Sequence, residues 1–224
     1  MVYFKKSYPS PFSLYDECIK PNGSYKKDDV LEQLYNDFEN KCYICESQGI
    51  ESLNIEHFAP HKNIFPIRKY NWSNLFWACS HCNQIKSSTE PLLNCTVLDA
   101  LVDEKIKYYI DDKLENNKII IKALFNDLET KNTVKLLQDV YNGTTQQNKY
   151  QAREKRNRIY DELSDFTSFL SKYHRTENSK EKIKLFKVIE DELSNESAFT
   201  AFKRWIVRDN SYFYKEFKHY LKDN

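Results

Sequence analysis

The stretch NWSNLFWACSHCNQIKSS, residues 71–88, joins an apolar run to Cys79 and Cys82, which are separated by two residues. A second pair with the same spacing, Cys42 and Cys45, lies earlier in the sequence KCYICE. Each pair can grip one side of a tetrahedral zinc ion through its thiolates. A set of buried thiols without metal is the alternative. The doubled spacing favours one zinc site built from all four cysteines.

The segment between the two pairs contains IEHFAPH at residues 55–61, in which Glu56 directly precedes His57. A neutral histidine can take a proton from water near pH 7, and a carboxylate suits a hard cation such as magnesium. Both tasks occur in metal-assisted hydrolysis of a phosphodiester. Asn74 and Asn83 could supply the other polar groups, one fixing the loop and one placing an amide oxygen on the ion. A histidine with Phe58 directly after it and Ile55 two residues before it is often a hydrogen-bonded core residue instead. The functional interpretation of the pair therefore depends on the cysteines around it.

Hydrophobic spacing predicts the elements around these motifs. A helix is expected over 28–40 with Asp28 as N-cap, and residues 53–58 form one strand of a hairpin. Because adjacent strand residues point to opposite faces, Glu56 and His57 need a bend or twist to serve one site. The other expectations are an arm over 1–26, a loop over 60–71, a helix after the second cysteine pair, a hairpin of 105–110 with 118–124, and helices from about 127, over about 146–173, 180–194, 198–209 and 212–222.

The overall composition bounds the class of protein. The formal charge is +1 and the pI is about 7.6, so any surface for nucleic acid must be local. The first residues lack the apolar core of a secretory signal, and no stretch approaches the roughly 18 apolar residues of a membrane span. We therefore expect a cytoplasmic protein without membrane contact. Thiols stay reduced in that compartment, so the six cysteines indicate metal binding or burial.

The motifs KCYICE, IEHFAPH and NWSNLFWACSHCNQIKSS resemble the zinc-containing HNH endonuclease family over about residues 41–95. The resemblance implies an α+β fold, with a zinc-stabilised ββα-metal core followed by a β-hairpin and an α-helical C-terminal region. Residues 1–96 would hold the N-terminal arm, a helix and the nuclease core, and residues 97–224 the hairpin and a helical partner-docking region. A looser resemblance, reaching the arginines near 153–158, is to the PtuB-like HNH subunit of Septu-type antiphage defence. That subunit works beside an ABC-class ATPase and sometimes within a retron module.

The resemblance also implies a role for each motif residue. His57 is the general base, and Asn74 ties the loop and orients that base. Glu56 and Asn83 bind the catalytic divalent ion, Mg²⁺ or Mn²⁺, and the four cysteines bind a structural Zn²⁺. Lys86 is expected near the substrate phosphate.

Four other residues have less specific expectations. His61 stands where this branch of the HNH family usually has Lys. Three roles are open for it: a phosphate contact, a change in metal coordination or a surface position. His81 is expected to be structural or exposed. The unpaired cysteines, Cys18 and Cys95, are expected to be small buried side chains.

Basic residues occur in two places that could contact phosphates. The run NKYQAREKRNR at 148–158 includes Arg153 and Arg156, and a solvated helical face is the alternative for it. Lys62 and Arg68 lie in the loop beside the histidine motif. Such contacts position a nucleic-acid backbone without reading its bases.

The expected function is that of a metal-dependent HNH endonuclease, the effector subunit of a bacterial antiphage complex with an ABC-class ATPase. DNA is the favoured substrate, and RNA, including tRNA, is chemically open. The alternative is a non-catalytic zinc module that binds nucleic acid or bridges proteins, which would have no use for hard-metal ligands beside a histidine. The half after residue 125 is expected to dock the partner through exposed aromatic residues, namely Tyr212, Phe213, Tyr214, Phe217 and Tyr220.

Overall fold

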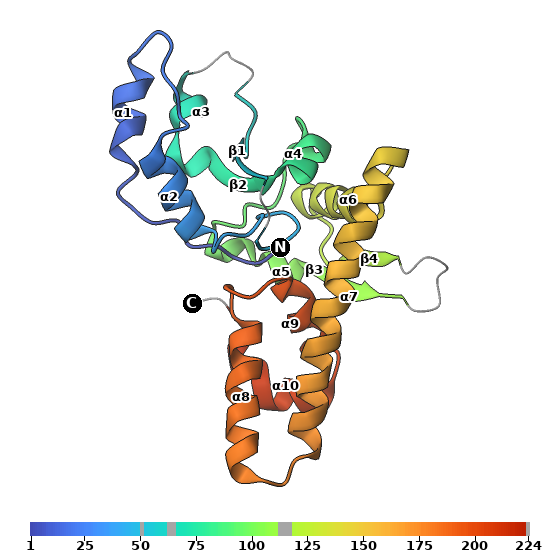
Figure 1. The fold of residues 1–224 in the computed structure, drawn as a ribbon. Helices are drawn as coiled ribbons and strands as arrows, with labels where there is room; N and C mark the ends of the chain where they lie inside the picture. Colours follow the sequence, from blue (N-terminus) through green and yellow to red (C-terminus); the bar gives the residue numbers. More distant parts are fainter. Residues whose placement is uncertain (50–51, 62–65, 112–117, 223–224) are drawn as a thin grey trace.

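The computed structural model describes residues 1–49, 52–61, 66–111 and 118–222, and it has the expected α+β fold (Figure 1). Two antiparallel pairs of strands, β1 with β2 and β3 with β4, are surrounded by helices. The strands are β1 (Leu53–His57), β2 (Leu75–Cys79), β3 (Ile106–Ile110) and β4 (Ile119–Ala123). The α-helices are α1 (Phe12–Cys18), α2 (Asp28–Asp37), α3 (Pro66–Tyr70), α4 (Ser80–Lys86), α5 (Val102–Lys105), α6 (Leu128–Asn142), α7 (Gln146–Arg175), α8 (Ser179–Leu193), α9 (Thr200–Arg208) and α10 (Ser211–Phe217). The short 3₁₀ helices are η1 (Trp72–Asn74), η2 (Leu98–Ala100) and η3 (Lys218–Tyr220).

The ββα unit is formed by β1, β2 and α4. Leu53 lies opposite Cys79 and His57 lies opposite Leu75, so the two motifs are placed side by side by strand pairing. Every residue of β2 is buried, which explains its continuous apolar sequence, LFWAC. Helix α4 begins directly after β2, and the second cysteine pair therefore spans the junction between strand and helix.

Helix α2 leads into the first cysteine pair. The predicted helix over 28–40 is confirmed, but it ends at Asp37 because Glu39 and Asn40 adopt positive φ angles of 51° and 49°. This left-handed turn redirects the chain toward Cys42. The N-cap is Lys27, so the expectation that Asp28 would cap the helix was wrong. Asp28 is instead the first helical residue, where its charge is favourable to the helix dipole.

The hairpin and the C-terminal helices follow the predicted order. Strands β3 and β4 match the expected hairpin, and the connection at 112–117 lies outside the described residues. Three short α-helices were not expected, among them α5, which directly precedes β3. Helix α3 lies in the segment predicted as loop over 60–71, and α1 lies in the N-terminal arm. Both have five to seven residues, too few to show a hydrophobic period.

The arm packs over the core, as expected. Phe4 is buried, and its backbone N–H donates to Cys95 O at 2.8 Å. The buried Lys6 ammonium donates to the carbonyl oxygens of Trp72 and Leu75 at 2.7 and 2.6 Å. These contacts fix the segment that leads into β2. In the described part of the chain, no helix has both the length and the apolar surface to cross a bilayer.

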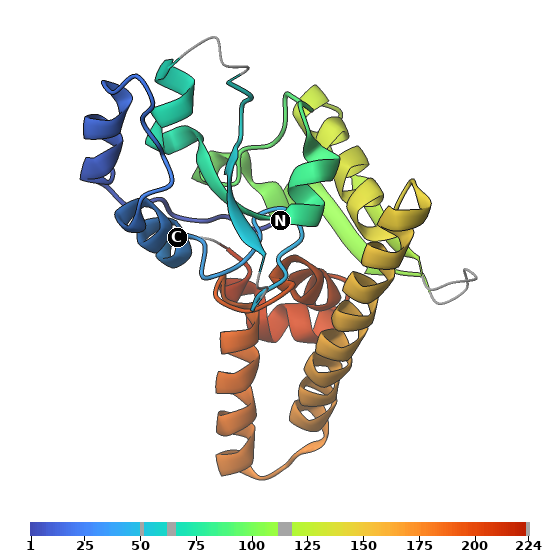
Figure 2. The same cartoon turned by 45° about the horizontal axis from the view of Figure 1, so that its top comes forward.

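Two hydrophobic cores share the long helix α7. This helix extends from the region of the strands to the side of α8 (Figure 2). The first core contains Cys95, Ile106 and Ile159, and so crosses the expected boundary between residues 96 and 97. The second core contains Phe166 and Phe217 and lies between the end of α7, α8 and α10. These helices project away from the strands in Figure 1. The division into 1–96 and 97–224 stays a prediction, since the first half of α7 packs with the strands and the second half with the projecting helices.

Candidate active site and metal centre

The four cysteines of the two pairs meet in one buried cluster. One Sγ atom from each of Cys42, Cys45, Cys79 and Cys82 lies within 4.8 Å of the others, and Cys45 and Cys79 Sγ are 3.9 Å apart. A tetrahedral zinc ion with Zn–S bonds of about 2.3 Å needs sulfurs about 3.8 Å apart. All four are free thiols rather than disulfides. The geometry therefore fits a closed, structural zinc site, which would join the end of α2 to the junction of β2 and α4.

A lysine from the long helix α7 lies against this cluster. Lys155 Nζ is 3.2 Å from Cys45 Sγ and 3.5 Å from Cys79 Sγ, and the side chain is buried. Four thiolates around Zn²⁺ leave a net charge of about −2, so a buried ammonium donating to two sulfurs offsets half of it. The sequence placed Lys155 in the basic run of α7, and nothing in that run distinguished it from its exposed neighbours.

We expect Lys155→Met to weaken zinc retention while keeping the long apolar stem. Loss of an outer-shell hydrogen-bond partner typically lowers metal affinity about 10- to 100-fold. Competition with a chromogenic chelator measures this change. Lys149→Met is the matched control, because Lys149 lies on the same helix and is exposed. Equal zinc affinity in both variants would show that Lys155 does not act on the metal centre.

The histidine of the second motif is held at the end of β1. His57 Nε2 lies 3.0 Å from Lys69 O, so Nε2–H donates to this carbonyl and Nδ1 carries the lone pair. The ring is half-buried and contacts Tyr25 and His61, whose ring centroids are 4.8 and 4.4 Å away. Burial lowers the pKa of His57 below its ordinary value, although the Lys69 carbonyl acts in the opposite direction. His57 is therefore a neutral base at pH 7 with one nitrogen available.

The asparagine at the start of β2 ties the loop that holds this histidine. Asn74 Oδ1 accepts from Ala59 N at 2.7 Å, and Nδ2 donates to the carbonyl oxygens of Ala59 and Arg68, both at 2.9 Å. Arg68 directly precedes Lys69, the residue whose carbonyl binds His57. Asn74 thus connects the segment after β1 to α3, next to the carbonyl that accepts from His57, and its role in orienting that base stays a prediction.

The acidic residue of the motif has a different neighbour. Glu56 is buried, and its Oε1 forms an ion pair with Lys86 Nζ at 2.6 Å. Lys86 also donates to His57 O at 3.1 Å and is fully buried on α4. Burial raises the pKa of Glu56, and Lys86 opposes this shift. The structure therefore does not place Lys86 on the surface, as a direct phosphate contact requires, but against the carboxylate.

Glu56 and Asn83 are the residues that could hold a divalent ion. Asn83 is half-buried on α4 and lies one turn before Lys86, so the two side chains share a face of the helix. A carboxylate and an amide oxygen suit a hard cation. Glu56 contacts α4 through Lys86, whereas His57 contacts α3. The two neighbours on β1 thus have different surroundings, as the alternation of a strand requires.

The basic residues expected near the substrate are dispersed. Arg68 is exposed on α3 and donates to Pro60 O at 3.2 Å, while Lys62 lies outside the described residues. Arg153 is exposed on α7. Arg156 is half-buried, and its Nη1 donates to Tyr141 O at 2.7 Å.

Several other residues can now be placed. His81 is buried, with Nε2 3.0 Å from Val140 O and Nδ1 2.6 Å from Gln151 Oε1, so it joins α4 to α6 and α7. The sequence predicted either a structural role or an exposed position for His81, and the structure shows the structural role. Cys95 is buried as expected, but Cys18 is exposed at the end of α1, and that expectation was wrong. His61 packs against the His57 ring, as described above.

The terminal aromatic residues do not form the expected exposed patch. Phe217 is fully buried, and its ring packs against Tyr173 and Phe186 in the second core. Tyr212 and Tyr214 are 38% and 47% exposed. The patch is smaller than predicted because α8 and the end of α7 give the terminal helix a core to pack on.

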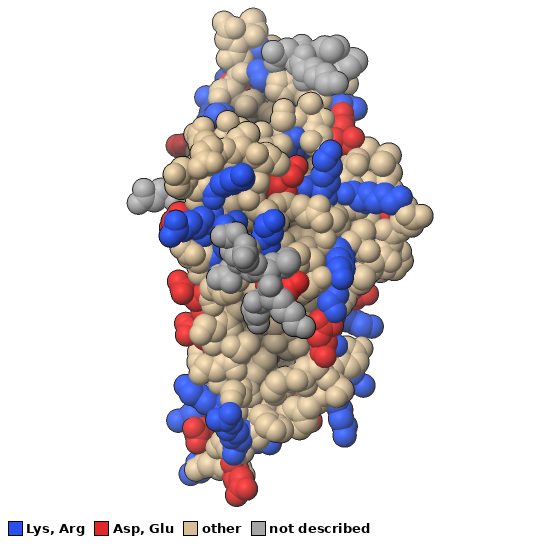
Figure 3. All heavy atoms as spheres, turned by 90° about the vertical axis from the view of Figure 1, so that its right-hand side faces the viewer, with Lys and Arg blue, Asp and Glu red and all other residues tan. Residues whose placement is uncertain are grey.

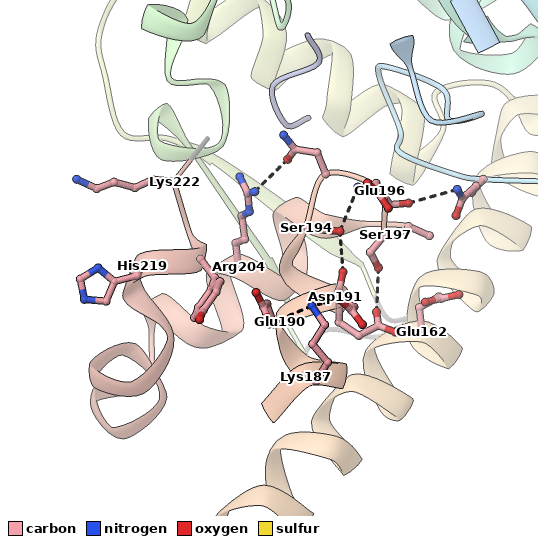
Figure 4. A pocket seen from close by; sticks show the side chains of 15 residues that line it. Glu162, Lys187, Glu190, Asp191, Ser194, Glu196, Ser197, Arg204, His219 and Lys222 are labelled. Carbon is pink, nitrogen blue, oxygen red and sulfur yellow. Dashed lines mark hydrogen bonds and ion pairs between the residues drawn. The ribbon is translucent and has the colours of Figure 1, made fainter. Parts of the chain in front are cut away.

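A separate hollow of about 710 Å³ lies between α8, α9 and the C-terminal segment (Figure 4). Its lining is rich in carboxylates, among them Glu162, Glu190 and Glu196. The fully buried Lys203 forms ion pairs with Glu162, at 3.1 Å, and with Glu192. The negative lining would repel a phosphate backbone, so we do not assign the substrate to this hollow.

The geometry combines a four-cysteine cluster that fits structural zinc with a ββα unit whose histidine is held by the Lys69 carbonyl. Comparison with known protein families agrees: residues 42–89 match the family model described as HNH endonuclease, a family of nuclease-type hydrolases. This match contains all four cysteines together with Glu56, His57, Asn74 and Asn83. No curated protein and no solved structure matches the chain.

Proposed function

We propose that this protein is a metal-dependent endonuclease that hydrolyses phosphodiester bonds of nucleic acid. The observation that carries the proposal is the orientation of His57. Its Nε2–H is engaged by Lys69 O, which leaves Nδ1 to accept a proton. Asn74 secures the loop behind it, and the whole arrangement lies within the segment that matches the HNH endonuclease family.

The proposed reaction assigns a separate task to each side chain. His57 Nδ1 takes the proton from the attacking water, and the bond from Nε2–H to Lys69 O stabilises the imidazolium that results. Glu56 and Asn83 would hold Mg²⁺ or Mn²⁺, which neutralises charge on the phosphate and the departing oxygen. Lys86 supplies a positive charge to Glu56, and ion binding by Glu56 requires this pair to rearrange.

Metal dependence tests the proposal directly. We expect cleavage of labelled DNA or RNA when Mg²⁺ or Mn²⁺ is supplied, and only background cleavage when it is omitted. Omission and re-addition are preferable to a strong chelator, because a chelator would also remove zinc from the cysteines. Zinc content is therefore measured in every sample. Equal cleavage without added metal, at unchanged zinc content, would contradict the proposal.

The second candidate is a zinc module without catalysis. The ion pair between Glu56 and Lys86 favours it, because the carboxylate already has a buried cation as its partner. This candidate gains support if no nucleic acid is cleaved with either metal and with the partner present. The assay should contain DNA and total RNA, since a site that attacks the phosphate permits both.

The cellular role is a finer proposal that rests on the resemblance to the Septu-type HNH subunit. We propose that the protein acts in the cytoplasm as an antiphage effector beside an ABC-class ATPase, with a retron component in some systems. The helices of the second core project from the nuclease part and offer Tyr212 and Tyr214 for docking. Truncation near residue 125 is unsuitable as a test, because α6 and α9 contribute to the first core. Co-purification of the full chain with the ATPase is the appropriate assay.

A further inference from the structure

A second hollow, of about 480 Å³, lies where the end of α6, the start of α7 and the start of β4 meet. Among the described residues, its charged lining consists of Lys118, Lys149, Arg153 and Arg156, without a carboxylate. The exposed ring of Tyr150 also faces it. Figure 3 views this side of the molecule and shows Lys and Arg side chains around the middle of the face, with Asp and Glu side chains between some of them.

Backbone contacts hold the walls of this basic pocket in place. The Asn142 side chain accepts from Ile119 N at 3.2 Å and donates to Ile119 O at 2.9 Å, which positions the neighbouring Lys118. Gly143 has a φ of 72°, and a Cβ there would lie 2.6 Å from Lys149 N, so the turn between α6 and α7 is tight. Arg156 is held by its bond to Tyr141 O. The pocket is therefore formed before any ligand binds.

The same helix joins the basic pocket to the nuclease core. Lys155 lies between the pocket residues Arg153 and Arg156 in sequence but points inward to the zinc cysteines. Gln151 bonds to His81, which is on α4 with Asn83. The start of α7 thus presents cations outward while its opposite face is anchored beside both metal-binding motifs.

The charges of the pocket indicate its ligand. Burial lowers the pKa of Arg156; Tyr160 opposes this shift, and the nearby Arg153 cation repels Arg156 and so acts in the same direction as burial. A phosphate backbone would relieve this repulsion. Tyr150 adds an aromatic face that is 64% exposed, on which a base can stack. A duplex keeps its base faces covered, whereas a single strand can offer both a phosphate and an unpaired base.

We propose that the basic pocket binds a single-stranded segment of the nucleic-acid substrate, with its phosphates on Lys149 and Arg153 and a base on Tyr150. This inference rests on the proposed nuclease function and adds a substrate class to it. The contacts are to the backbone and to a ring face, so the site selects strandedness rather than sequence.

The test measures binding without cleavage. Fluorescence anisotropy follows a labelled single strand of about 16 nucleotides, a length suited to such grooves, in buffer without divalent metal. The Lys149→Glu, Arg153→Glu double variant should bind about 10- to 100-fold more weakly and show a smaller salt dependence. The matched control is Lys180→Glu, Lys184→Glu, which makes the same charge change on exposed positions of α8. Circular dichroism verifies that both variants are folded.

A third variant separates stacking from charge. Tyr150→Ser should weaken single-strand binding about 5- to 100-fold and leave the salt dependence unchanged. Equal binding by the pocket and control double variants would overturn the inference, as would no binding by the unaltered protein. Equal competition by a duplex of the same sequence would overturn the preference for single strands. Because cleavage is assayed separately, a protein that binds through the pocket but never cleaves would refute the nuclease proposal alone.

Discussion

The His57→Ala variant is expected to cleave nucleic acid about 10²- to 10⁴-fold more slowly than the unaltered protein, the usual contribution of a positioned general base. The reason is that Nδ1 is the nitrogen left with a lone pair once Nε2–H binds Lys69 O. Alanine removes both nitrogens, so the attacking water loses the base that the Lys69 carbonyl holds in place. Single-turnover cleavage with saturating Mg²⁺ measures the loss at the chemical step.

The control for this variant is His219→Ala, the same chemical change at an exposed position near the C-terminus. It should cleave at the unaltered rate. Zinc content and thermal unfolding should be similar in both variants, since His57 is only half-buried and does not contact the cysteine cluster. Undiminished cleavage by His57→Ala would show that another group acts as the base.

The Cys79→Ser variant is expected to lose zinc and to unfold the core around it. Zinc binding in small cysteine sites contributes about 10–16 kcal/mol at pH 7, and this free energy is part of the free energy of folding. The effect should spread beyond the ββα unit, because Lys155 would then lie buried beside a cluster that no longer carries the compensating charge. Zinc content per chain and the cooperativity of thermal unfolding measure the result.

Cys18→Ser is the matched control, because Cys18 is exposed and lies outside the cluster. It should keep its zinc and unfold at the unaltered temperature. If Cys79→Ser also retained one zinc per chain and the same unfolding temperature, the four-cysteine site would not stabilise the fold. The two large predictions are thereby distinct: His57→Ala removes activity from a folded protein, and Cys79→Ser removes the fold.

The local elements could largely be predicted because they depend on short-range patterns. Helical spacing of apolar residues located α2 and α6 to α9, and two β-rich runs located the second hairpin. The short α1 and α3 could not be found in this way, since fewer than two turns show no period. The helix ends were also less certain, as α2 shows: its end depends on a left-handed turn at Glu39 and Asn40.

The candidate site, too, could be predicted only in part from the sequence. Spacing in the sequence identified the four cysteines, and the motif around His57 and Asn74 indicated which residues to examine. The sequence did not indicate which groups the charged side chains contact. Lys155 and Lys86 are buried against Cys45 and Glu56, although Lys155 belongs to a basic run and Lys86 was expected beside the substrate phosphate.

The sequence by itself determined which four cysteines cluster, the ββα order and the helical C-terminal half, because cysteine spacing and apolar periodicity act over a few residues. Only the tertiary structure decided which cations of α7 turn inward to the metal centre and which line a pocket. The physical reason is that a lysine stem can extend to solvent or lie along a core. Its direction depends on which face of the helix packs, and residues distant in the chain set that face.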